Sequence, residues 1–401
     1  MSVPRLQISD RLRELMSFRR LTGETPRVLV LRSHYWLDGG CLNAANILGW
    51  QVEAVPVVME GTLSRDAVAK LLETIITFRP DFILSINLSG MDTNGMFAAL
   101  FDDLQTPHVT WFVDDPRTIL MRNPAYASNR TIALTWDDAY APHLREVGFP
   151  FVEWFPLATD PAVFNAPPGE SCFPPTFVGN SMEAFSERAW AGLDAYPHLK
   201  QVARDVFDAG LVTRENFIAG VDRIVGSDIA ATLDAETDRL LEMLFFIEGT
   251  RRLRRTYAEA LVPEGLELRG DEGWARNFPQ SGDPLTYLDQ LPTFYGQCAL
   301  NFNATSIQMP NTVNQRVFDC PAAGGFLLTD AQPDLERLFD VKHEVAQYRS
   351  VEECVDLFRY FRSREDARRP IIEAARARIL SEHTFVHRML RIVDLVRKHF
   401  A

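Results

Sequence analysis

The chain has 401 residues, enough for two domains of ordinary size, and its 46% hydrophobic and 24% charged residues are the balance of a globular protein. A formal net charge of −13 argues against a broad nucleic-acid-binding surface, because neutralising a phosphate backbone needs a clustered basic face. No run approaches the roughly 18 apolar residues of a membrane span. The N-terminal segment carries charges throughout and lacks the apolar region of a secretory signal, so we expect a cytoplasmic location.

The first part of the chain alternates strand-like and helical segments, after an amphipathic helix expected at about 8–19. Short runs rich in β-branched and aromatic residues are separated by stretches with apolar residues at helical spacing, such as 66–78 and 138–147. Strict alternation predicts a parallel, doubly wound α/β sheet. We therefore expect a Rossmann-like domain over residues 1–158. Its strands are expected at 27–31, 51–58, 81–87, 108–113, 131–136 and 151–156.

A second series of strand-like runs follows a linker rich in proline, glycine and small residues at 157–175. Helical stretches separate these runs too, which predicts a second Rossmann-like domain over 174–382. The strands are expected at 176–179, 266–270, 298–302, 325–330 and 343–348.

More than 80 residues separate the first two of these strands, where a crossover needs only about a dozen. The stretch has no strand-like alternation, so we expect a helical insertion at about 183–260. Its apolar segment 240–249 must be buried against something. The insertion could form a subdomain that helps to choose a partner molecule, or could simply pack on itself.

The last segment, 383–401, predicts a strongly amphipathic helix. Leu390, Val393, Val396 and Phe400 are expected near one face. Such a helix could pack across the domain junction or cap the second domain.

The five cysteines are odd in number, widely spaced and form no Cys-x-x-Cys pair, which favours reduced core thiols over disulfides or a zinc site. They are Cys41, Cys172, Cys298, Cys320 and Cys354.

Residues 301–330 carry the strongest chemical pattern of the chain. They indicate a strand end, a polar loop, a helix beginning near Pro310, and a Gly-Gly turn into the next strand. A helix N-terminus at the carboxyl end of a parallel strand favours an anion such as a phosphate. Arg316 and Asp319 are three apart and suit a phosphate and a ribose. On spacing alone, a capped helix with a surface ion pair is the favoured interpretation of the two residues. The other candidate ligands in this segment are Asn303, Asn311, Thr312, Asn314 and Gly324.

Two further loops of the second domain are candidates for the same ligand. Gly179, Asn180 and Ser181 follow its first strand, and the glycine would permit close approach of a phosphate to the backbone. Gly270 ends another strand and could line a nucleobase pocket. Ordinary turns are the alternative for both loops.

The basic run at 251–255 favours a solvated helix face.

In the first domain, the loop after the first strand contains the pair Gly39-Gly40, where a ligand could approach the backbone. His34 and Asp38 of the same loop would then face the cleft between the domains and are candidate catalytic residues. Loop solvation is the alternative interpretation. Asp114 and Asp115 follow the strand at 108–113, at the end where such sheets bind ligands. We expect Asp115 to cap the following helix.

Asp114 is then the candidate general base, because a carboxylate can deprotonate an acceptor hydroxyl.

The order and spacing of several motifs resemble the spore maturation protein CgeB family. The matching segments are RPDFIL, TPHVTWFVDDPRTIL, VGFPFVEWFPLATDPAVF, QRVFDCPAAGGFLLTD, DLERLF, HEVAQYRSVEECVDLFRYF and SEHTFVHR. The resemblance covers nearly the whole chain except the insertion. That family is similar to retaining GT-B glycosyltransferases, so the resemblance implies two Rossmann-like domains facing a cleft and a nucleotide-activated sugar as donor.

The resemblance also assigns roles within 301–330. Such donor sites often carry two acidic residues separated by seven, and here those positions hold Asn311 and Asp319. By resemblance Asp319 would bind ribose, while Arg316 or the amides near Thr312 would bind the diphosphate. The amide at Asn311 leaves the stereochemistry open. No bound metal or tight cofactor is expected, since His383 and His387 lack a third ligand nearby.

The resemblance therefore implies a glycosyltransferase that moves a sugar from a nucleoside diphosphate to a protein, polysaccharide or lipid-linked glycan. A catalytically inactive module that binds a nucleotide sugar or a glycan is the alternative, favoured by Asn311 and Asp319. An epimerase or phosphorylase is the third class. A pyridoxal-dependent phosphorylase would need a lysine, and after the insertion only Lys342 and Lys398 remain.

Overall fold

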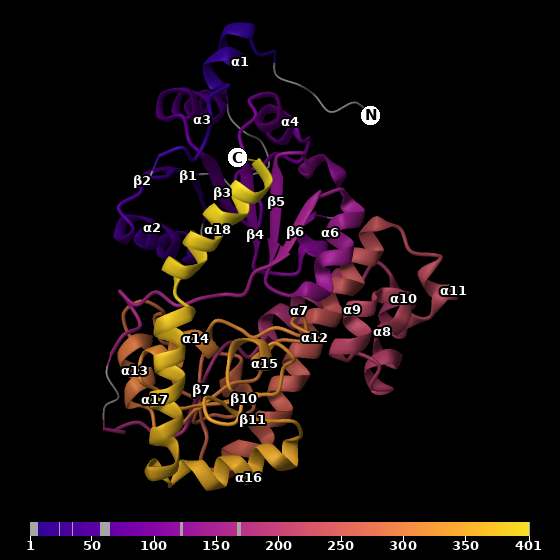
Figure 1. The fold of residues 1–401 in the computed structure, drawn as a ribbon. Coiled ribbons are helices and arrows are strands. Elements are labelled where there is room, and N and C mark those ends of the chain that lie inside the picture. Colours follow the sequence, from indigo (N-terminus) through magenta and orange to yellow (C-terminus); the bar gives the residue numbers. More distant parts are fainter. Residues whose placement is uncertain are drawn as a thin grey trace. The chain divides into compact units, whose positions relative to one another are not determined.

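The computed structural model describes residues 7–23, 25–33, 35–56, 65–120, 123–166 and 170–400. The chain divides into two compact units (Figure 1). Unit 1 comprises Met1–Pro156 and Thr384–Ala401, and unit 2 comprises Leu157–His383. The expected domains were 1–158 and 174–382, with a terminal helix at 383–401. Unit 2 begins at Leu157 and so includes the expected linker, and the last helix is assigned to unit 1.

Unit 1 is built on six parallel strands in the order β2-β1-β3-β4-β5-β6. The three central strands β3, β4 and β5 are buried along their whole length, as expected where helices cover both faces of a parallel sheet. The strands are β1 (Arg27–Arg32), β2 (Gln51–Pro56), β3 (Phe82–Ile86), β4 (His108–Phe112), β5 (Thr131–Thr135) and β6 (Phe151–Trp154). The helices are α1 (Asp10–Met16), α2 (Leu37–Ile47), α3 (Arg65–Phe78), α4 (Met96–Asp103), α5 (Pro116–Leu120), α6 (Ala141–Val147) and α18 (Phe385–Phe400), with 3-10 turns η1 (Pro124–Tyr126) and η2 (Asp138–Tyr140).

Helix α18 packs against α2 within unit 1. The ring of Phe385 lies edge-on to Trp36 and Trp111, with centroids 6.4 and 6.1 Å away. A Cβ atom on Gly40 would lie 2.6 Å from that ring, so Gly40 is explained by helix packing and not by ligand approach. The prediction that Leu390 lies on the apolar face is wrong. Leu390 is 44% exposed, because the buried face of α18 passes through Met389 instead. The remaining buried residues of α18 are Phe385, Arg388, Ile392, Val393, Leu395 and Val396.

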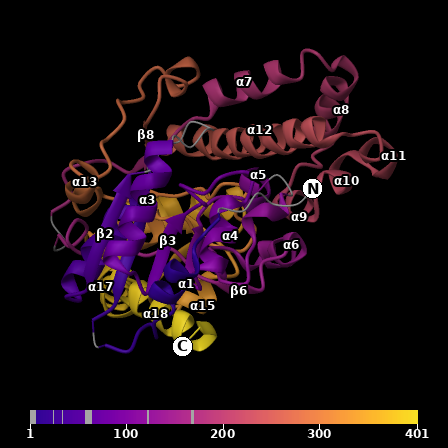
Figure 2. The same cartoon turned by 90° about the horizontal axis from the view of Figure 1, so that it is seen from above.

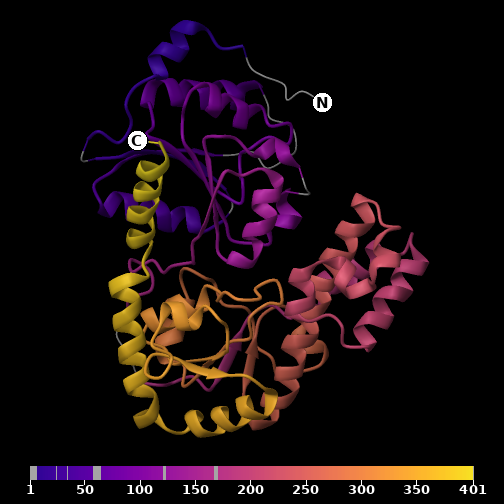
Figure 3. The same ribbon diagram turned by 45° about the vertical axis from the view of Figure 1, so that its right-hand side comes forward.

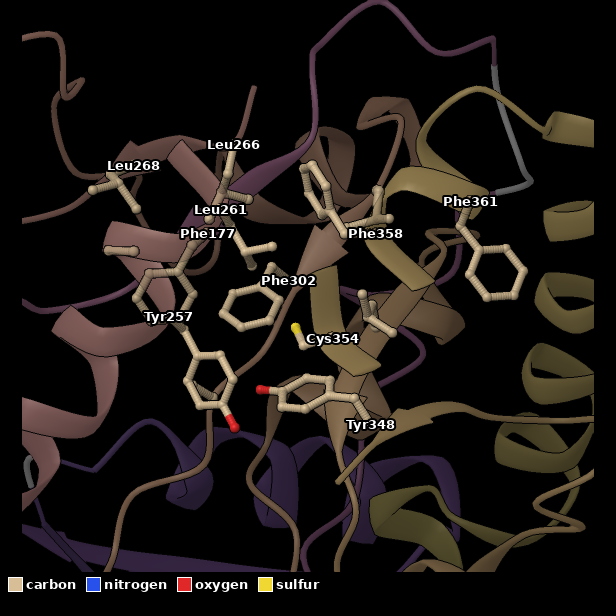
Figure 4. Packing of buried hydrophobic residues seen from close by; sticks show 14 of the residues in the cluster. Phe177, Tyr257, Leu261, Leu266, Leu268, Phe302, Tyr348, Cys354, Phe358 and Phe361 are labelled. Atoms are coloured by element: carbon tan, nitrogen blue, oxygen red, sulfur yellow. The ribbon is translucent and has the colours of Figure 1, made fainter. Parts of the chain in front are cut away.

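Unit 2 contains five parallel strands in the order β11-β10-β9-β7-β8. They are β7 (Thr176–Val178), β8 (Glu267–Arg269), β9 (Asn301–Phe302), β10 (Leu327–Asp330) and β11 (Ala346–Tyr348). Beneath the sheet lies a core of aromatic side chains, in which Tyr257, Phe302 and Tyr348 contact one another (Figure 4). The predicted two-sheet α/β fold with parallel strands is confirmed.

The helices of unit 2 fall into two groups. The first forms the insertion between β7 and β8: α7 (Glu183–Gly192), α8 (Pro197–Asp208), α9 (Arg214–Ala219), α10 (Val221–Val225), α11 (Ser227–Ala230) and α12 (Ala235–Leu261). The second follows β8: α13 (Leu291–Gln297), α14 (Arg316–Ala322), α15 (Leu335–Leu338), α16 (Val351–Arg362) and α17 (Glu365–Glu382). The 3-10 turns η3 (Val262–Glu264) and η4 (Trp274–Arg276) flank β8.

The predicted helical insertion is confirmed, and it has a core of its own. Figure 2 shows α7 lying beside the long helix α12, and Figure 3 shows the short helices gathered toward one end of α12. The apolar segment 240–249 is buried there, through Leu241, Leu244 and Phe245. Packing among the helices of the insertion itself thus explains most of the burial of this segment.

None of the described cysteines forms a disulfide, and four of them are buried as expected. Cys172 differs, because it lies exposed before β7.

Candidate functional site

Polar side chains and tight loops gather at the carboxyl ends of the strands of unit 2. Because β7, β8, β9 and β10 are parallel, the loops that follow them emerge at one edge of the sheet. Those loops contain the predicted residues 179–181, 270 and 303–316. The described structure therefore brings the sequence-predicted residues of the second domain to a common edge.

The loop after β7 is held in place by the loop after β8. Asp271 accepts hydrogen bonds from the backbone N–H and the hydroxyl of Ser181, at 2.5 and 2.7 Å. The indole N–H of Trp274 donates to the carbonyl of Gly179 at 2.8 Å. A Cβ on Gly270 would lie 2.1 Å from that carbonyl oxygen, so Gly270 is required for this loop contact. Its suggested nucleobase role stays a prediction.

Asn303 organises the polar side chains that follow β9. It is fully buried, and its Oδ1 atom accepts from Nδ2 of Asn314 at 2.8 Å and from Nη1 of Arg316. Its own Nδ2 donates to the hydroxyls of Thr329 and Thr305, at 2.9 and 3.3 Å. With every polar atom engaged, Asn303 acts as a positioning residue for Arg316 and Asn314.

Arg316 places a positive charge at this edge. Its Nη2 donates to the carbonyl of Val178, and its guanidinium lies over the ring of Phe177, 5.3 Å from the centroid. The Nε atom is buried and has no hydrogen-bond partner among the described residues. Among the residues that the structure describes, only neutral groups hold this cation, and no carboxylate contacts it.

The helix expected near Pro310 begins six residues later, at Arg316, which corrects the sequence interpretation. In a helix starting at Pro310, the carbonyl of Asn311 would accept from Gln315. It accepts instead from the backbone N–H of Asp334, at 2.9 Å. Thr312 is buried in the resulting loop, so the expected anion site on helical amides near Thr312 is not formed there.

Asp319 and Arg316 do not form the expected neighbouring pair. The Asp319 carboxylate is 1% exposed and accepts from Thr159 and Gln315, at 2.7 and 2.9 Å, and from the Tyr287 hydroxyl. Burial raises the pKa of Asp319 to about 7, against the lowering effect of these donors. Three protein donors thus hold this buried carboxylate, and among the described residues none of them is Arg316.

The backbone conformation at position 324 explains why a glycine is found there. Its φ of 76° lies in the left-handed region, where the chain turns from α14 into β10. This turn accounts for the residue without a ligand.

Arg254 belongs to the same edge, and the sequence interpretation missed it. It comes from α12, inside the basic run 251–255 that was expected to be a solvated face. Its Nη1 donates to the carbonyl of Asn180 at 2.7 Å, and its guanidinium lies 5.9 Å from the centroid of Phe177. No local signal distinguished it from its basic neighbours, since Asn180 is 74 residues away.

The candidate residues of unit 1 cluster at the ends of β3 and β4. Nδ2 of Asn87 donates to Oδ2 of Asp114 at 2.8 Å, and its Oδ1 accepts from the N–H of Val113. Asn87 and Leu88 both have positive φ angles, 50° and 57°, a strained conformation that often marks functional loops. Asp115 accepts from the N–H of Arg117 at 2.9 Å, which confirms its capping role.

The loop after β1 is clamped by Asp38. This carboxylate is buried at the start of α2 and accepts from the N–H and hydroxyl of Ser33. Burial raises its pKa. His34 lies outside the described residues. Near this loop, burial and then Asp114 raise the pKa of Tyr35, which places the tyrosine beside the Asn87–Asp114 pair.

Across the described ranges, no cluster of three or more His, Cys, Asp or Glu side chains is arranged to hold a metal ion. His383 contacts the carbonyl of Leu338 at 2.9 Å and packs between Phe318 and Phe339. In the part of the chain that the structure covers, no helix has both the length and the apolarity of a membrane span.

Solved structures of similar architecture cover almost the whole chain. Sucrose-phosphate synthase from Thermosynechococcus elongatus matches 94% of this chain and 99% of its own, with a TM-score of 0.55 and 10% identity. A glycosyltransferase from Rickettsia africae matches the same shares, with a TM-score of 0.54 and 10% identity. Anabaena HepE, solved with UDP and glucose, matches 93% and 99%, with a TM-score of 0.53 and 11% identity. The chain has the GT-B fold.

Residues 245–394 match a family model described as glycosyl transferase-like. No curated protein matches the sequence. The matched segment of this GT-B chain begins within α12 and includes Arg254, Asn303, Arg316 and Asp319. Family and fold together support sugar transfer as its general activity.

Proposed function

We propose that this GT-B protein is a glycosyltransferase that takes a sugar from a nucleoside diphosphate, and that it is related to the CgeB family. The proposal is carried by Arg316, a cation fixed by neutral partners beside the Gly179–Ser181 loop, inside the segment that matches the family model. The acceptor would be a protein, a polysaccharide or a lipid-linked glycan. HepE is solved with UDP and glucose, so a uridine nucleotide is the first donor to test.

In this proposal Arg316 stabilises the leaving diphosphate. Negative charge grows on the bridging oxygen as the sugar bond breaks, and a preoriented cation stabilises the transition state more than the ground state. Asn303 and the Val178 carbonyl fix the guanidinium before substrate arrives, so little reorganisation accompanies the reaction. Asn180 and Ser181 line the adjoining loop, and Asn314 would add a hydrogen-bonding amide.

Asp114 is the proposed base for the acceptor hydroxyl. Its Oδ2 is held by Asn87, and it is only partly buried, so the carboxylate remains accessible. We assign Asp38 a positioning role instead, because it is buried and clamps Ser33. The suggested role of His34 stays a prediction.

A nucleotide-sugar-binding module without activity is the second candidate. Two observations favour it: Asn311 replaces the first expected carboxylate, and the buried carboxylate of Asp319 already accepts hydrogen bonds from three protein donors. In this second candidate, the hydrogen bonds of Asp319 hold α14 in place, and its carboxylate does not bind ribose directly.

A thermal-shift screen with UDP, GDP and dTDP tests the donor class, followed by calorimetry on the best nucleotide. Arg316→Ala should weaken binding by about 2 kcal/mol, the typical value for a charged hydrogen-bond partner. Arg349→Ala, at an exposed position before α16, is the control and should bind like the parent. No stabilisation by any of the three nucleotides would refute the proposal.

Release of nucleoside diphosphate from the matching nucleotide sugar then separates the two candidates. The enzyme would hydrolyse or transfer the sugar, and Asp114→Asn would slow transfer while leaving nucleotide affinity unchanged. Tight binding of the sugar nucleotide with no turnover, over a range of acceptors, would favour the binding module.

A further inference from the structure

The helical insertion is joined to the loop that follows β9. The hydroxyl of Thr250, on α12, lies 3.0 Å from that of Ser306 and accepts the N–H of Ile307 at 3.3 Å. Ile307 itself lies in the hydrophobic core of the insertion. A Cβ at Gly249 would lie 2.5 Å from Cδ1 of Ile307, so the glycine makes room for this contact. The insertion is therefore part of the edge that holds Arg316.

A second contact comes from α9 of the insertion. Nη2 of Arg214 donates to the carbonyl of Thr305 at 2.5 Å and to Oδ2 of Asp330 at 2.6 Å. Oδ1 of Asp330 accepts in turn from the N–H and hydroxyl of Thr305. Arg214 is thus a paired, structural arginine that fixes the insertion to the carboxyl ends of β9 and β10.

Three of the four arginines in the run 251–255 are also paired. Arg251 and Arg252 both contact Glu248, at 2.7 Å. Arg255 contacts Glu259, also at 2.7 Å. Arg254 differs, because within the described residues it has neither a carboxylate within ion-pair distance nor a partner for its buried Nε.

Arg254 and Arg316 share one small environment. Both guanidiniums lie over Phe177, one bonded to the carbonyl of Asn180 and the other to that of Val178. Burial, and then the nearby charge of Arg316, lowers the pKa of Arg254 to about 10. Asp271 and Asp330 act in the opposite direction on this pKa, but within the described residues neither lies within ion-pair distance of Arg254. A bound anion would therefore stabilise two cations held this close together.

We infer that Arg254, supplied by the helical insertion, is a second ligand for the diphosphate of the donor. The inference rests on the proposed function and extends it, since it makes the insertion a component of the donor site. A diphosphate carries more than one negative charge, and arginine presents several donors to phosphate oxygens. Part of Arg254 remains accessible, as a ligand contact requires.

Calorimetry with UDP and uridine, on the parent, Arg254→Gln and Arg255→Gln, tests the inference. Arg255 is the matched control, because it lies next to Arg254 on α12 and pairs with Glu259. Arg254→Gln should weaken UDP binding at least tenfold and leave uridine binding unchanged, and Arg255→Gln should leave both unchanged. Equal UDP affinity in Arg254→Gln and the parent, or an equal loss for uridine, would overturn the inference. If UDP does not bind the parent, GDP with guanosine and dTDP with thymidine replace it, and failure of all three overturns the proposed function as well.

If Arg254→Gln does not fold, the parent protein itself provides the measurement. With ¹⁵N-labelled arginine, the Nε signal of Arg254 can be assigned by its loss in Arg254→Lys. Addition of the nucleoside diphosphate should shift this signal, while the nucleoside alone should not. An unchanged signal at saturating diphosphate would overturn the inference.

Discussion

Gly40 of α2 lies so close to Phe385 of α18 that a Cβ atom would be 2.6 Å from two carbons of the ring. Gly39, its neighbour in the same helix, has no atom within 4 Å of the corresponding position. A methyl group would therefore meet the Phe385 ring at the buried Gly40 and open space at Gly39.

Replacing each glycine by alanine should change the free energy of unfolding in opposite directions. Gly40→Ala forces α18 away from α2 and should cost roughly 1–3 kcal/mol, the usual range for overpacking. Gly39→Ala should stabilise by up to about 1 kcal/mol, because alanine is the better helix former. Urea unfolding measures both, and a stabilised Gly40→Ala would contradict the packing account.

Among the carboxylates of the insertion, we expect Glu248 to contribute most to the stability of the fold. It is buried, and Arg251, Arg252 and Ser186 together lower its pKa to about 2 despite burial. Glu248→Gln removes the carboxylate that Arg251 and Arg252 share, so that Arg251 keeps only its ion pair with Glu183. The substitution should lower the free energy of unfolding by about 3 kcal/mol at pH 7. Glu259→Gln, which breaks an exposed pair with Arg255, should cost less than about 1 kcal/mol.

The difference in stability between the parent and Glu248→Gln should depend on pH in a defined direction. The folded-state pKa of Glu248 is depressed, so its ionised form stabilises the fold above pH 4.5 and stops doing so as pH falls toward 2. Thermal melts of the parent and Glu248→Gln should converge over this window. A gap that stays constant down to pH 2 would show that packing, and not charge, causes it.

Asp319 should behave in the opposite sense. Its folded-state pKa of about 7 is raised by burial, so between about pH 4 and 7 the native state binds more protons than the unfolded state. The free energy of unfolding of the parent, relative to Asp319→Asn, should therefore fall as pH rises through this range, by at most about 1.4 kcal/mol per unit. Calorimetric melts from pH 4.5 to 7.5 measure the slope, and parallel curves would refute the raised pKa.

Ile307 should link the stability of the insertion to nucleotide binding. Ile307→Ala and Leu244→Ala both empty buried volume in the same core, and each should cost roughly 2–5 kcal/mol. Only Ile307 belongs to the loop after β9, so only Ile307→Ala should also weaken nucleoside diphosphate binding. Calorimetry at a temperature where both variants are folded decides the point, and equal affinities would show that the loop does not need this anchor.

The sequence predicted most of the fold because its strands are apolar and well separated. The ends of β4 and β5, at 108–112 and 131–135, lie within one residue of the predicted ends. Such strands are easy to predict because a buried parallel strand is a continuous apolar run. The start of α14 was missed, because the Asn311 carbonyl is taken by Asp334, a contact between loops that periodicity cannot show.

The site was predicted less completely for the same reason. Arg316 was found through a local motif. Arg254 was not, because its partner Asn180 lies across the whole insertion, and its neighbours in the run are ordinary ion-paired arginines. The burial of Asp319 depends on Thr159 and Tyr287, which lie 160 and 32 residues away.

Unit 2 is one continuous segment, whereas unit 1 is closed by a helix that follows unit 2 in the chain. On the ribosome, the Rossmann-like sheet of unit 1 is therefore made first but waits for about 230 further residues before Phe385 can cover Gly40 and Trp111. Unit 2 meets no such delay. We expect the half of the molecule that is translated later to reach its native state earlier.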